Sequence, residues 1–450
     1  MIHLSRKRAL APVLAMWLLQ AGSASALSLI QAYEAARQND PTYRMAVYEN
    51  EVGQQYKELG RSGLLPSLSA SFSSGRNKSD LTTPDMLGNI STIQRNYSSR
   101  SSVIQLRQTL FNLDSAARYY QGVAQTNYSD AQFSGRGQEL IVRLVSAYVE
   151  AKYAEEQLAL MVVQRDAYAE RRRVNDRMFE KGEGTKTDML ETQAKLDLAE
   201  AQVLEAKDKL TDARNALVAL VGQEVTALDA LRDDFRVKPM QPSSFDEWKT
   251  IALEHNQEII AKRLAVEMAL QEINKGRAGH MPRLDFVASV SDTYSDTSYT
   301  INQDINTASI SLQLNMPLYS GGYVTAITSQ AVSNHEKAKA DLDDKIGQVL
   351  IELRKNYSLI LSSTLRLDAL ENSVDSARML VEATQKSIGA GMRTNLDLLN
   401  AQQQLFAAKR DLSQARNNYL LYYLKLRQAA GVVDMGDLRE VAGYFVADPQ

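Results

Sequence analysis

The sequence contains no cysteine, so its fold does not depend on disulfides and no lipid can be attached through an N-terminal cysteine. It also contains no run of about 18 consecutive apolar residues, the length that a membrane-spanning helix requires. Insertion into a bilayer, if it occurs, would therefore have to use β-strands, which pair their backbone groups with one another.

The most apolar segment lies at the N-terminus and is short. A basic triplet at residues 6–8 precedes an apolar run over residues 9–19 and then the small residues Ala-Ser-Ala. This order is typical of a secretory signal peptide, so residues 1–26 are predicted to be removed by cleavage between Ala26 and Leu27. Removal takes away three cations and no acids, which changes the formal charge from −3 to −6 (−3 − 3). A mildly acidic mature chain argues against nucleic acid as a partner.

Proline is absent from two long stretches, residues 85–238 and 318–448. Because proline inside a helix removes a hydrogen bond and clashes with the preceding turn, its absence permits very long helices. Both stretches carry apolar or small residues at alternating steps of three and four, the repeat of a coiled coil. The first expected helix covers residues 113–181 and is followed by a return helix that ends near Val221. The second covers residues 323–388 and is followed by a return helix that ends near Ala430. The first would be roughly 100 Å long at 1.5 Å per residue.

The breaks between these helices carry the same motif twice. FEKGEGTKTDMLETQAKL, starting at Phe179, aligns without a gap with IGAGMRTNLDLLNAQQQL, starting at Ile388. Upstream, GRSGLLPSLSASF from Gly60 matches GRAGHMPRLDFVA from Gly276. The chain is therefore predicted to be an internal duplication in which each half ends in a long helical hairpin. Its predicted parts are a signal peptide (1–26), a first repeat (27–221, tip near 182–188), a linker (222–245), a second repeat (246–430, tip near 389–397) and a C-terminal segment (431–450) that forms a belt with the linker.

Each repeat also carries two strand-like segments, near residues 66–76 and 98–110 and near 283–293 and 306–318. In the last of them apolar residues alternate with polar ones, which predicts a sheet with one dry and one wet face. On the strands alone, a membrane β-barrel and an ordinary soluble antiparallel sheet fit equally well. The signal peptide and the serine-rich polar face favour the barrel. The connecting residues, 77–97 and 294–305, are rich in Ser, Thr, Asn and Asp and are predicted to be surface loops.

Four strands cannot close a barrel, since single-chain barrels begin at about eight strands. An open sheet edge in lipid would leave backbone groups unpaired, so identical chains must complete the wall. Two copies would leave little room for a passage, whereas three would give a wide lumen. The predicted fold is therefore mainly α, with duplicated long helical hairpins forming a coiled-coil barrel and four strands per chain contributing to a trimeric 12-stranded membrane β-barrel.

Several strings occur in order along the chain: ARQNDP, GLLPSLS, QTLFN, GEGTKTD, GHMPRLDFVAS, MPLYSGG and GAGMRTNLDLLNAQ. In this combination the chain resembles outer-membrane channel-tunnels of the TolC family over essentially its whole mature length. The resemblance implies a homotrimeric duct held in outer-membrane lipid of a Gram-negative bacterium, with a long periplasmic helical portion. It also implies an inner-membrane ABC transporter and a periplasmic adaptor as partners, no cofactor, and no catalytic activity.

The resemblance further places a periplasmic gate at the two hairpin tips. It implies that Thr187 and Asp188 of the first tip face Arg393 of the second and form a polar clasp, which is strongest where water is excluded. Asp397 would form a ring of like charges around the axis of a trimer and select for cations. From the residues alone, an ordinary i,i+4 helix pair is the favoured interpretation of Arg393 and Asp397. The residues that would shape the tips and dock the adaptor are Gly182, Gly184, Thr185, Gly391 and Thr394.

Two residues depart from the family's pattern. Asn400 stands where a second lumen acid is expected, and Ile388 stands where a tyrosine would add a hydrogen bond to the clasp. The predicted gate therefore has one charged ring and fewer polar restraints. The basic run at residues 171–173 lies close to the first tip and could meet an adaptor, although a solvated helix face is the favoured interpretation of such a run.

The sequence gives no support for a metal or nucleotide site. His255, His280 and His335 lack metal-ligand spacing, and the glycine pairs lack the spacing of a phosphate loop.

The predicted function is an export duct for proteins in type I secretion, favoured by the ARQNDP opening and the missing N-terminal cysteine. Multidrug efflux is the alternative within the same family. A periplasmic coiled-coil adaptor would lack the paired strands, and a general porin would need more strands and no long helices.

Overall fold

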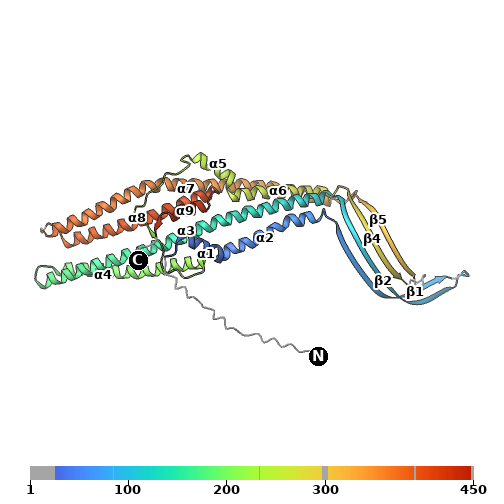
Figure 1. Cartoon of the computed structure of the whole chain (residues 1–450), viewed down its shortest axis with the longest axis horizontal. Coiled ribbons are helices and arrows are strands. Elements are labelled where there is room, and N and C mark those ends of the chain that lie inside the picture. The colour runs from blue at the N-terminus through green and yellow to red at the C-terminus, as the bar shows by residue number, and fades with distance from the viewer. Residues whose placement is uncertain (1–25, 85, 233, 296–302, 390–391, 447–450) are drawn as a thin grey trace, which may run out of the picture.

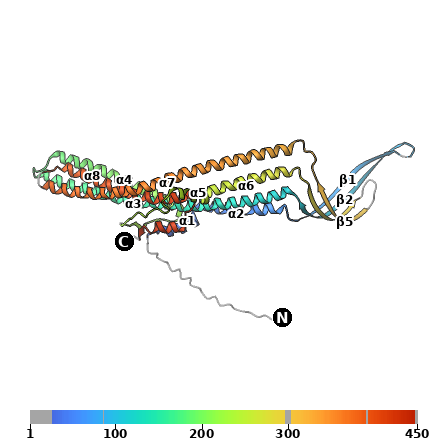
Figure 2. The same cartoon turned by 90° about the horizontal axis from the view of Figure 1, so that it is seen from above.

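The computed structural model describes residues 26–84, 86–232, 234–295, 303–389 and 392–446. The molecule is strongly elongated, with two helical hairpins at one end and a curved sheet at the other (Figure 1). Seen from above, the hairpins lie together at one end, while α2, α6 and α7 run toward the sheet at the other (Figure 2). No helix within the described residues combines the length and the apolar character needed to cross a membrane.

The predicted duplication is present in the short helices that open each repeat. Helices α1 (Leu29–Asn39) and α2 (Pro41–Ser62) correspond to α5 (Phe245–His255) and α6 (Gln257–Ala278). Asp40 ends α1 and caps α2 by accepting from two backbone N–H groups, and Asn256 does the same between α5 and α6. A side chain that satisfies the free N–H groups of a helix start fixes that start in the sequence.

The two long hairpins agree with the helices predicted from the sequence to within a few residues. They consist of α3 (Leu113–Glu180) with α4 (Lys186–Val221), and α7 (Tyr323–Gly389) with α8 (Asn395–Ala429). The predicted seam of α4 is the buried one: Leu196, Val203 and Leu210 are at most 8% exposed. Helix α3 contains 68 residues, and it packs along α4 at one end and along α2 and α6 toward the other.

Glycine allows α2 and α3 to approach very closely. A Cβ added at Gly122 would lie 2.4 Å from the carbonyl oxygen of Tyr56, and one added at Gly60 would lie 2.6 Å from that of Arg118. These distances are below van der Waals contact, so the two backbones pack directly against each other. The crossing of α2 and α3 therefore depends on residues without side chains.

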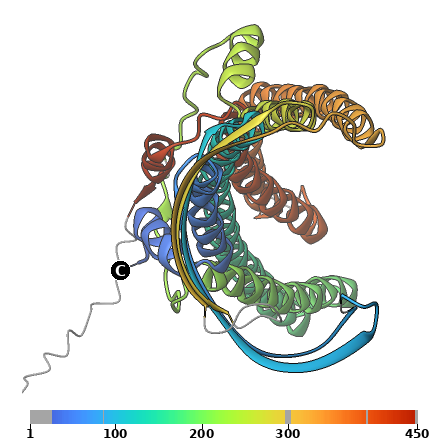
Figure 3. The same cartoon turned by 90° about the vertical axis from the view of Figure 1, so that its right-hand side faces the viewer.

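The main sheet has four antiparallel strands in the order β1-β2-β4-β5. The strands are β1 (Ser67–Pro84), β2 (Ile90–Phe111), β4 (Arg283–Ser295) and β5 (Gln303–Asn315). Figure 3 shows that the sheet is curved. Even-numbered residues of all four strands share one face of the sheet. This follows from the strand register, in which Leu68 pairs with Leu106, Leu106 with Ala288, and Ala288 with Ile310. The rule holds up to a register shift near Thr109.

The even-numbered face is the convex one. From Gly75 onward along β1 the odd-numbered residues are half-buried while the even-numbered ones are exposed, as expected when a curved sheet covers its own concave side. On β5 the even-numbered Ile310 and Leu312 are 78% and 67% exposed. On β4 the odd-numbered Asp285 is 3% exposed, and its carboxylate lies between Arg283 and Arg107. In the half of the sheet nearest the helices, most apolar side chains therefore point outward and most polar ones inward, with Val287 as an exception, and this is the arrangement of a membrane barrel.

Two loop predictions were wrong in their extent. Strands β1 and β2 continue through most of residues 77–97, and Pro84 still pairs with Ile90. The predicted loop over residues 294–305 is also shorter, because β4 reaches Ser295 and β5 begins at Gln303. The strands continue because backbone pairing does not require an apolar face. The strand predicted to end at residue 318 ends instead at Asn315, two residues before a proline that cannot donate to the ladder.

In their described parts the linker and the C-terminal segment pack together in a layer here called the belt. Strand β3 (Ala230–Leu231) pairs with β6 (Phe445–Val446), and α9 (Met435–Ala442) packs beside α1. The first predicted mature residue is held here too, since the N–H of Leu27 donates to the carbonyl of Ala227 at 2.9 Å. The largest apolar core of the described chain lies at this level.

Candidate functional site

The first hairpin tip, between α3 and α4, is closed by two glycines and a capping box. Gly182 has a φ of 76°, a conformation that favours glycine. A Cβ added at Gly184 would lie 3.1 Å from that of Met178, so this residue must also be small. The hydroxyl of Thr185 accepts from the N–H of Asp188 at 3.1 Å, and the Asp188 carboxylate accepts from the N–H of Thr185 at 3.3 Å. Both glycines thus serve the turn, and both polar residues start α4.

The second tip repeats this capping box. The hydroxyl of Thr394 accepts from the N–H of Asp397 at 3.2 Å, and the Asp397 carboxylate accepts from the N–H of Thr394 at 2.9 Å. The hydrogen bonds from Thr394, and to a smaller degree the charge of Arg393, lower the pKa of Asp397. This carboxylate is therefore ionised at neutral pH. Gly391 lies outside the described residues.

The predicted clasp residues lie at the tips. For Arg393 the structure shows the alternative interpretation, a local ion pair with Asp397. The Nη1 atom of Arg393, in the turn before α8, lies 3.7 Å from the carboxylate of Asp397, four residues later in the first turn of that helix. The ion pairs of the described residues do not include one between Arg393 and Asp188. Thr187 and Asn400 are exposed and Ile388 is half-buried. The clasp and the charged ring remain predictions, because both concern contacts that opening or assembly would change.

A buried polar network joins the two hairpins just behind the tips. Asn395, the first residue of α8, accepts from the guanidinium of Arg171 on α3 and donates to the hydroxyl of Thr192 on α4 at 3.3 Å. Asn175 on α3 also donates to this hydroxyl, at 2.7 Å, and the hydroxyl donates to the carbonyl of Asp188 at 2.8 Å. Thr192, Asn175 and Asn395 are 0%, 4% and 9% exposed. These hydrogen bonds thus hold α3 and α4 of the first repeat to α8 of the second, at a site that is shielded from water.

None of the four residues of this network was predicted as such from the sequence, and Arg171 was considered only as part of the basic run at residues 171–173. Burial lowers the pKa of its guanidinium, and the nearby charge of Asp188 acts in the opposite direction. Its neighbours Arg172 and Arg173 form ion pairs along their own helix, with Asp176 at 3.5 Å and Glu170 at 3.2 Å. The solvated-face interpretation therefore holds for the second and third arginines of the run and fails for the first. The repeated Thr-x-x-Asp motif is a local helix-start signal, but the predictions from the sequence used it only as part of the duplicated tips.

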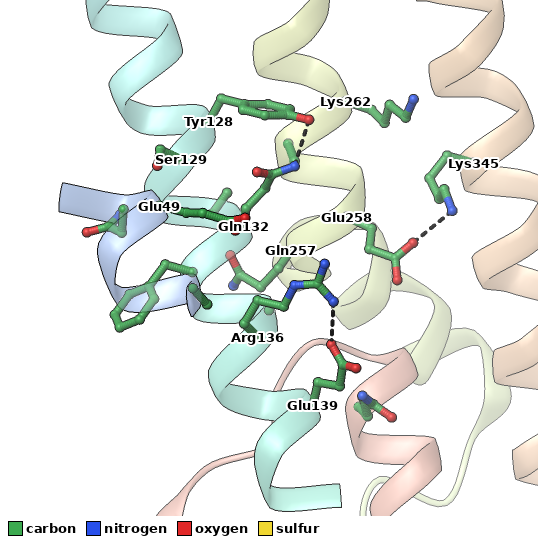
Figure 4. A pocket seen from close by; sticks show the side chains of 17 residues that line it. Glu49, Tyr128, Ser129, Gln132, Arg136, Glu139, Gln257, Glu258, Lys262 and Lys345 are labelled. Carbon is green, nitrogen blue, oxygen red and sulfur yellow. Dashed lines mark hydrogen bonds and ion pairs between the residues drawn. The ribbon is translucent and has the colours of Figure 1, made fainter. Parts of the chain in front are cut away.

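An open crevice of about 410 Å³ lies between α2, α3, α6 and α7, near the belt. Figure 4 shows its polar lining, in which the ammonium of Lys345 lies 2.8 Å from the Glu258 carboxylate and Arg136 lies 2.8 Å from Glu139. The first pair links α7 to α6, so it helps to hold the wall together. Within the described residues, no group of three or more His, Cys, Asp or Glu side chains could hold a metal ion.

The comparison with known families matches the two repeats separately. The model of the family described as outer membrane efflux protein matches residues 32–223 and 248–432. These two segments include the two hairpins and the strands that precede them. The chain belongs to the outer membrane efflux protein family. As a member of this family it is an outer-membrane channel protein, with the sheet in the membrane and the helical hairpins extending into the periplasm.

Curated relatives are similar over nearly the whole chain. The alkaline protease secretion protein AprF of Pseudomonas aeruginosa is 43% identical over 435 residues, covering 96% of this chain and 90% of that protein. The proteases secretion protein PrtF of Dickeya chrysanthemi is 36% identical over 438 residues, covering 96% and 94%. The outer membrane protein TolC of Escherichia coli is 26% identical over 424 residues, covering 91% and 83%.

Solved structures confirm the fold. The outer membrane protein VceC of Vibrio cholerae superimposes with a TM-score of 0.76 at 17% identity, covering 90% of this chain and 96% of that one. The CmeC outer membrane channel of Campylobacter jejuni gives a TM-score of 0.78 at 17% identity, covering 99% and 98%. Identities this low establish the architecture, and function has to be argued from the site and the full-length relatives.

Proposed function

We propose that this chain is the outer-membrane exit duct of a type I protein secretion system, in which an ABC transporter drives export across both membranes. One observation carries the proposal: the full-length similarity to two proteins named for protease secretion, at 43% and 36% identity. The fold supplies what such a duct needs, since the convex face of the sheet suits lipid and the hairpins reach far into the periplasm.

The duct is a homotrimer. The sheet of one chain ends in unpaired edges at β1 and β5, which are unfavourable in lipid. Three copies joined edge to edge provide twelve strands, enough to surround a lumen. The inner-membrane ABC transporter supplies the energy, the periplasmic adaptor meets the hairpin tips around Gly182, Gly184, Thr185 and Thr394, and the chain itself catalyses no reaction.

The decisive experiment is deletion of the gene in its native host. Secreted proteins and sensitivity to drugs are scored together, with the gene restored on a plasmid as the control. Type I secretion predicts that proteins of the cognate substrate class disappear from the medium while drug sensitivity stays unchanged. Unchanged secretion with increased drug sensitivity would instead assign the chain to multidrug efflux.

We also propose that Asp188 and Thr187 engage Arg393 as a clasp when the gate is shut. Asp188→Ala or Arg393→Ala should then raise single-channel conductance in planar bilayers, because each removes one side of the pair. Since Asp188 also caps α4, Thr185→Ala is the matched control: it disrupts the same capping box and leaves the carboxylate in place. Equal conductance of the clasp variants and the wild type would reject the clasp, and an equal rise in the control would assign the effect to the cap.

The ring of Asp397 is a separate proposal about ion selectivity. In a trimer three ionised carboxylates would surround the axis, and such rings attract cations. Asp397→Asn should therefore shift the reversal potential measured in a salt gradient toward zero, while Asn400→Asp should shift it the other way by adding a second ring. Asp375→Asn is the control, because this exposed residue pairs with Arg378 on α7, away from the tip. Identical reversal potentials in Asp397→Asn and the wild type would place Asp397 outside the constriction.

A further inference from the structure

Three cations stand on the convex face of the β1–β2 hairpin, directly beyond the apolar part of the sheet. The last apolar row across the four strands is Ala70, Ile104, Val290 and Ala308. Phe72 extends the apolar face of β1 by one more position. Beyond it the even-numbered positions of the hairpin become polar, and the cations on this face are Arg76, Lys78 and Arg100.

The strand register places these cations side by side. Arg100 pairs with Ser74 and Arg76 pairs with Ser98, which makes the two arginines diagonal neighbours with Cβ atoms roughly 7–8 Å apart. Lys78 follows two residues after Arg76 on the same face. All three side chains are exposed, and no hydrogen bond or ion pair joins any of them to another described side chain. Other polar residues of the hairpin are paired across the strands, as Gln94 is with Asp80 at 2.9 Å.

The height of the cluster above the apolar band matches the lipid headgroup layer. Arg76 lies four residues beyond Phe72, and Arg100 lies four residues beyond Ile104. At about 3.3 Å per residue and a strand tilt of roughly 40°, this corresponds to about 10 Å along the membrane normal. Long basic side chains reach several ångströms from their backbone toward an interface. Asp80, the next charge outward on β1, stands farther from the band.

We propose that Arg76, Lys78 and Arg100 bind the phosphate groups of phosphorylated lipids in the outer leaflet. Arginine forms bidentate hydrogen bonds with phosphate, and two adjacent arginines with a lysine provide a compact cationic site. The apolar surface immediately beneath the cluster is suited to the acyl chains of the same molecule, which favours a lipid over free phosphate. Each trimer would carry three such sites.

The neighbouring strands confine the site to the β1–β2 half of the sheet. Asp292 on β4 pairs with Ser102 and is a diagonal neighbour of Arg100 on the convex face, and Asp304 on β5 lies at the height of Arg100, two strands away. Their charge repels phosphate, so a lipid phosphate is attracted to one half of each subunit. This arrangement orients the bound lipid along the β1–β2 strands.

The test measures lipid binding by the full-length trimer in detergent, using bis-phosphorylated lipid A and native mass spectrometry. A cation near an anionic lipid surface changes affinity by roughly fivefold, so replacing all three by serine should weaken binding by about 100-fold. Arg76→Ser and Arg100→Ser alone should each weaken it by about fivefold, and these single variants serve if the triple variant does not assemble. Arg76→Lys with Arg100→Lys should retain most of the binding.

Arg95→Ser is the matched control, since Arg95 is a cation of the same hairpin that pairs with Ser79 on the concave face. It should bind lipid A like the wild type. Dephosphorylated lipid A should bind the wild type as weakly as lipid A binds the triple variant. The proposal fails if the triple or single variants bind like the wild type, if dephosphorylated lipid A binds equally well, or if millimolar inorganic phosphate alone displaces the lipid. Protein secretion tests the export duct separately, so the two proposals can fail independently.

Discussion

Replacing Arg171 with alanine is expected to raise the single-channel conductance of the purified trimer in planar bilayers. Separation of the two hairpins has to break the bond between the Arg171 guanidinium and Asn395. Without the guanidinium, the side-chain oxygen of Asn395 loses its donor in a buried position. An unsatisfied buried polar group costs about 1–3 kcal/mol, which reduces the population of the joined arrangement by roughly 5- to 150-fold.

Arg173→Ala is the control for this prediction. It removes the same charge two residues along α3, but its side chain is 75% exposed and pairs with Glu170 on its own helix. It should leave the conductance unchanged. Arg171→Lys should give an intermediate value, because it retains a cation but loses the planar donor group. If Arg171→Ala and Arg173→Ala both conduct like the wild type, the network does not restrain the gate.

Replacing Gly431 with alanine is expected to prevent stable assembly of the belt. Gly431 has a φ of 77°, and a Cβ there would lie 2.3 Å from the carbonyl oxygen of His255 and 2.5 Å from the Cα of Asn256. Both are backbone atoms, so no side chain can move aside. The left-handed conformation costs an alanine about 1–2 kcal/mol and the overpacking about 1–3 kcal/mol more. A loss of roughly 2–5 kcal/mol should appear in urea unfolding of the trimer or as a low yield of folded protein.

Gly347→Ala provides the comparison for this second prediction. Gly347 lies on an exposed part of α7, and a Cβ there would meet nothing within 4 Å in the described chain. Alanine is favoured over glycine inside a helix by about 1 kcal/mol, so this variant should be as stable as the wild type or slightly more so. Equal unfolding midpoints for Gly431→Ala and the wild type would show that the junction between α5 and α6 can move.

The helices could be predicted from the sequence because their signals are local. Proline is missing where the helices run, apolar residues recur at the period of a coiled coil, and threonine and aspartate mark the start of α4 and α8. The bounds of α3 and α7 agree with the prediction to within one residue, since glycine and the caps limit them. Local signals of this kind do not depend on the tertiary structure.

The outer part of the β1–β2 hairpin could not be predicted in the same way. Alternation reveals a strand only when one face is dry, and beyond Phe72 both faces carry serine, asparagine, threonine and charged residues. Composition of this kind is also typical of loops. What continues the strands is the pairing of their backbones up to Pro84 and Ile90, and backbone pairing leaves little trace in the side chains.

The role of Arg171 could not be predicted because it depends on a distant segment. A basic run on a long helix is usually solvated, and two of its three arginines follow that rule. The first is different because Asn395, 224 residues later, lies next to it. Both residues would have had to be recognised together, and neither carries a local signal for the other.

The continuity of α3 limits how a gate at its far end could move. This helix runs 68 residues from the sheet to the first tip without a proline, and α7 runs 67 residues to the second. Sharp kinks in helices arise mostly at proline, at glycine–serine pairs or at local disruptions of the hydrogen-bond ladder. Residues 138–180 of α3 and 348–388 of α7 contain neither proline nor glycine. A displacement of the tips would therefore be spread as gentle curvature over these residues rather than concentrated at a hinge, so substitutions far from the tips can be expected to alter how easily the passage widens.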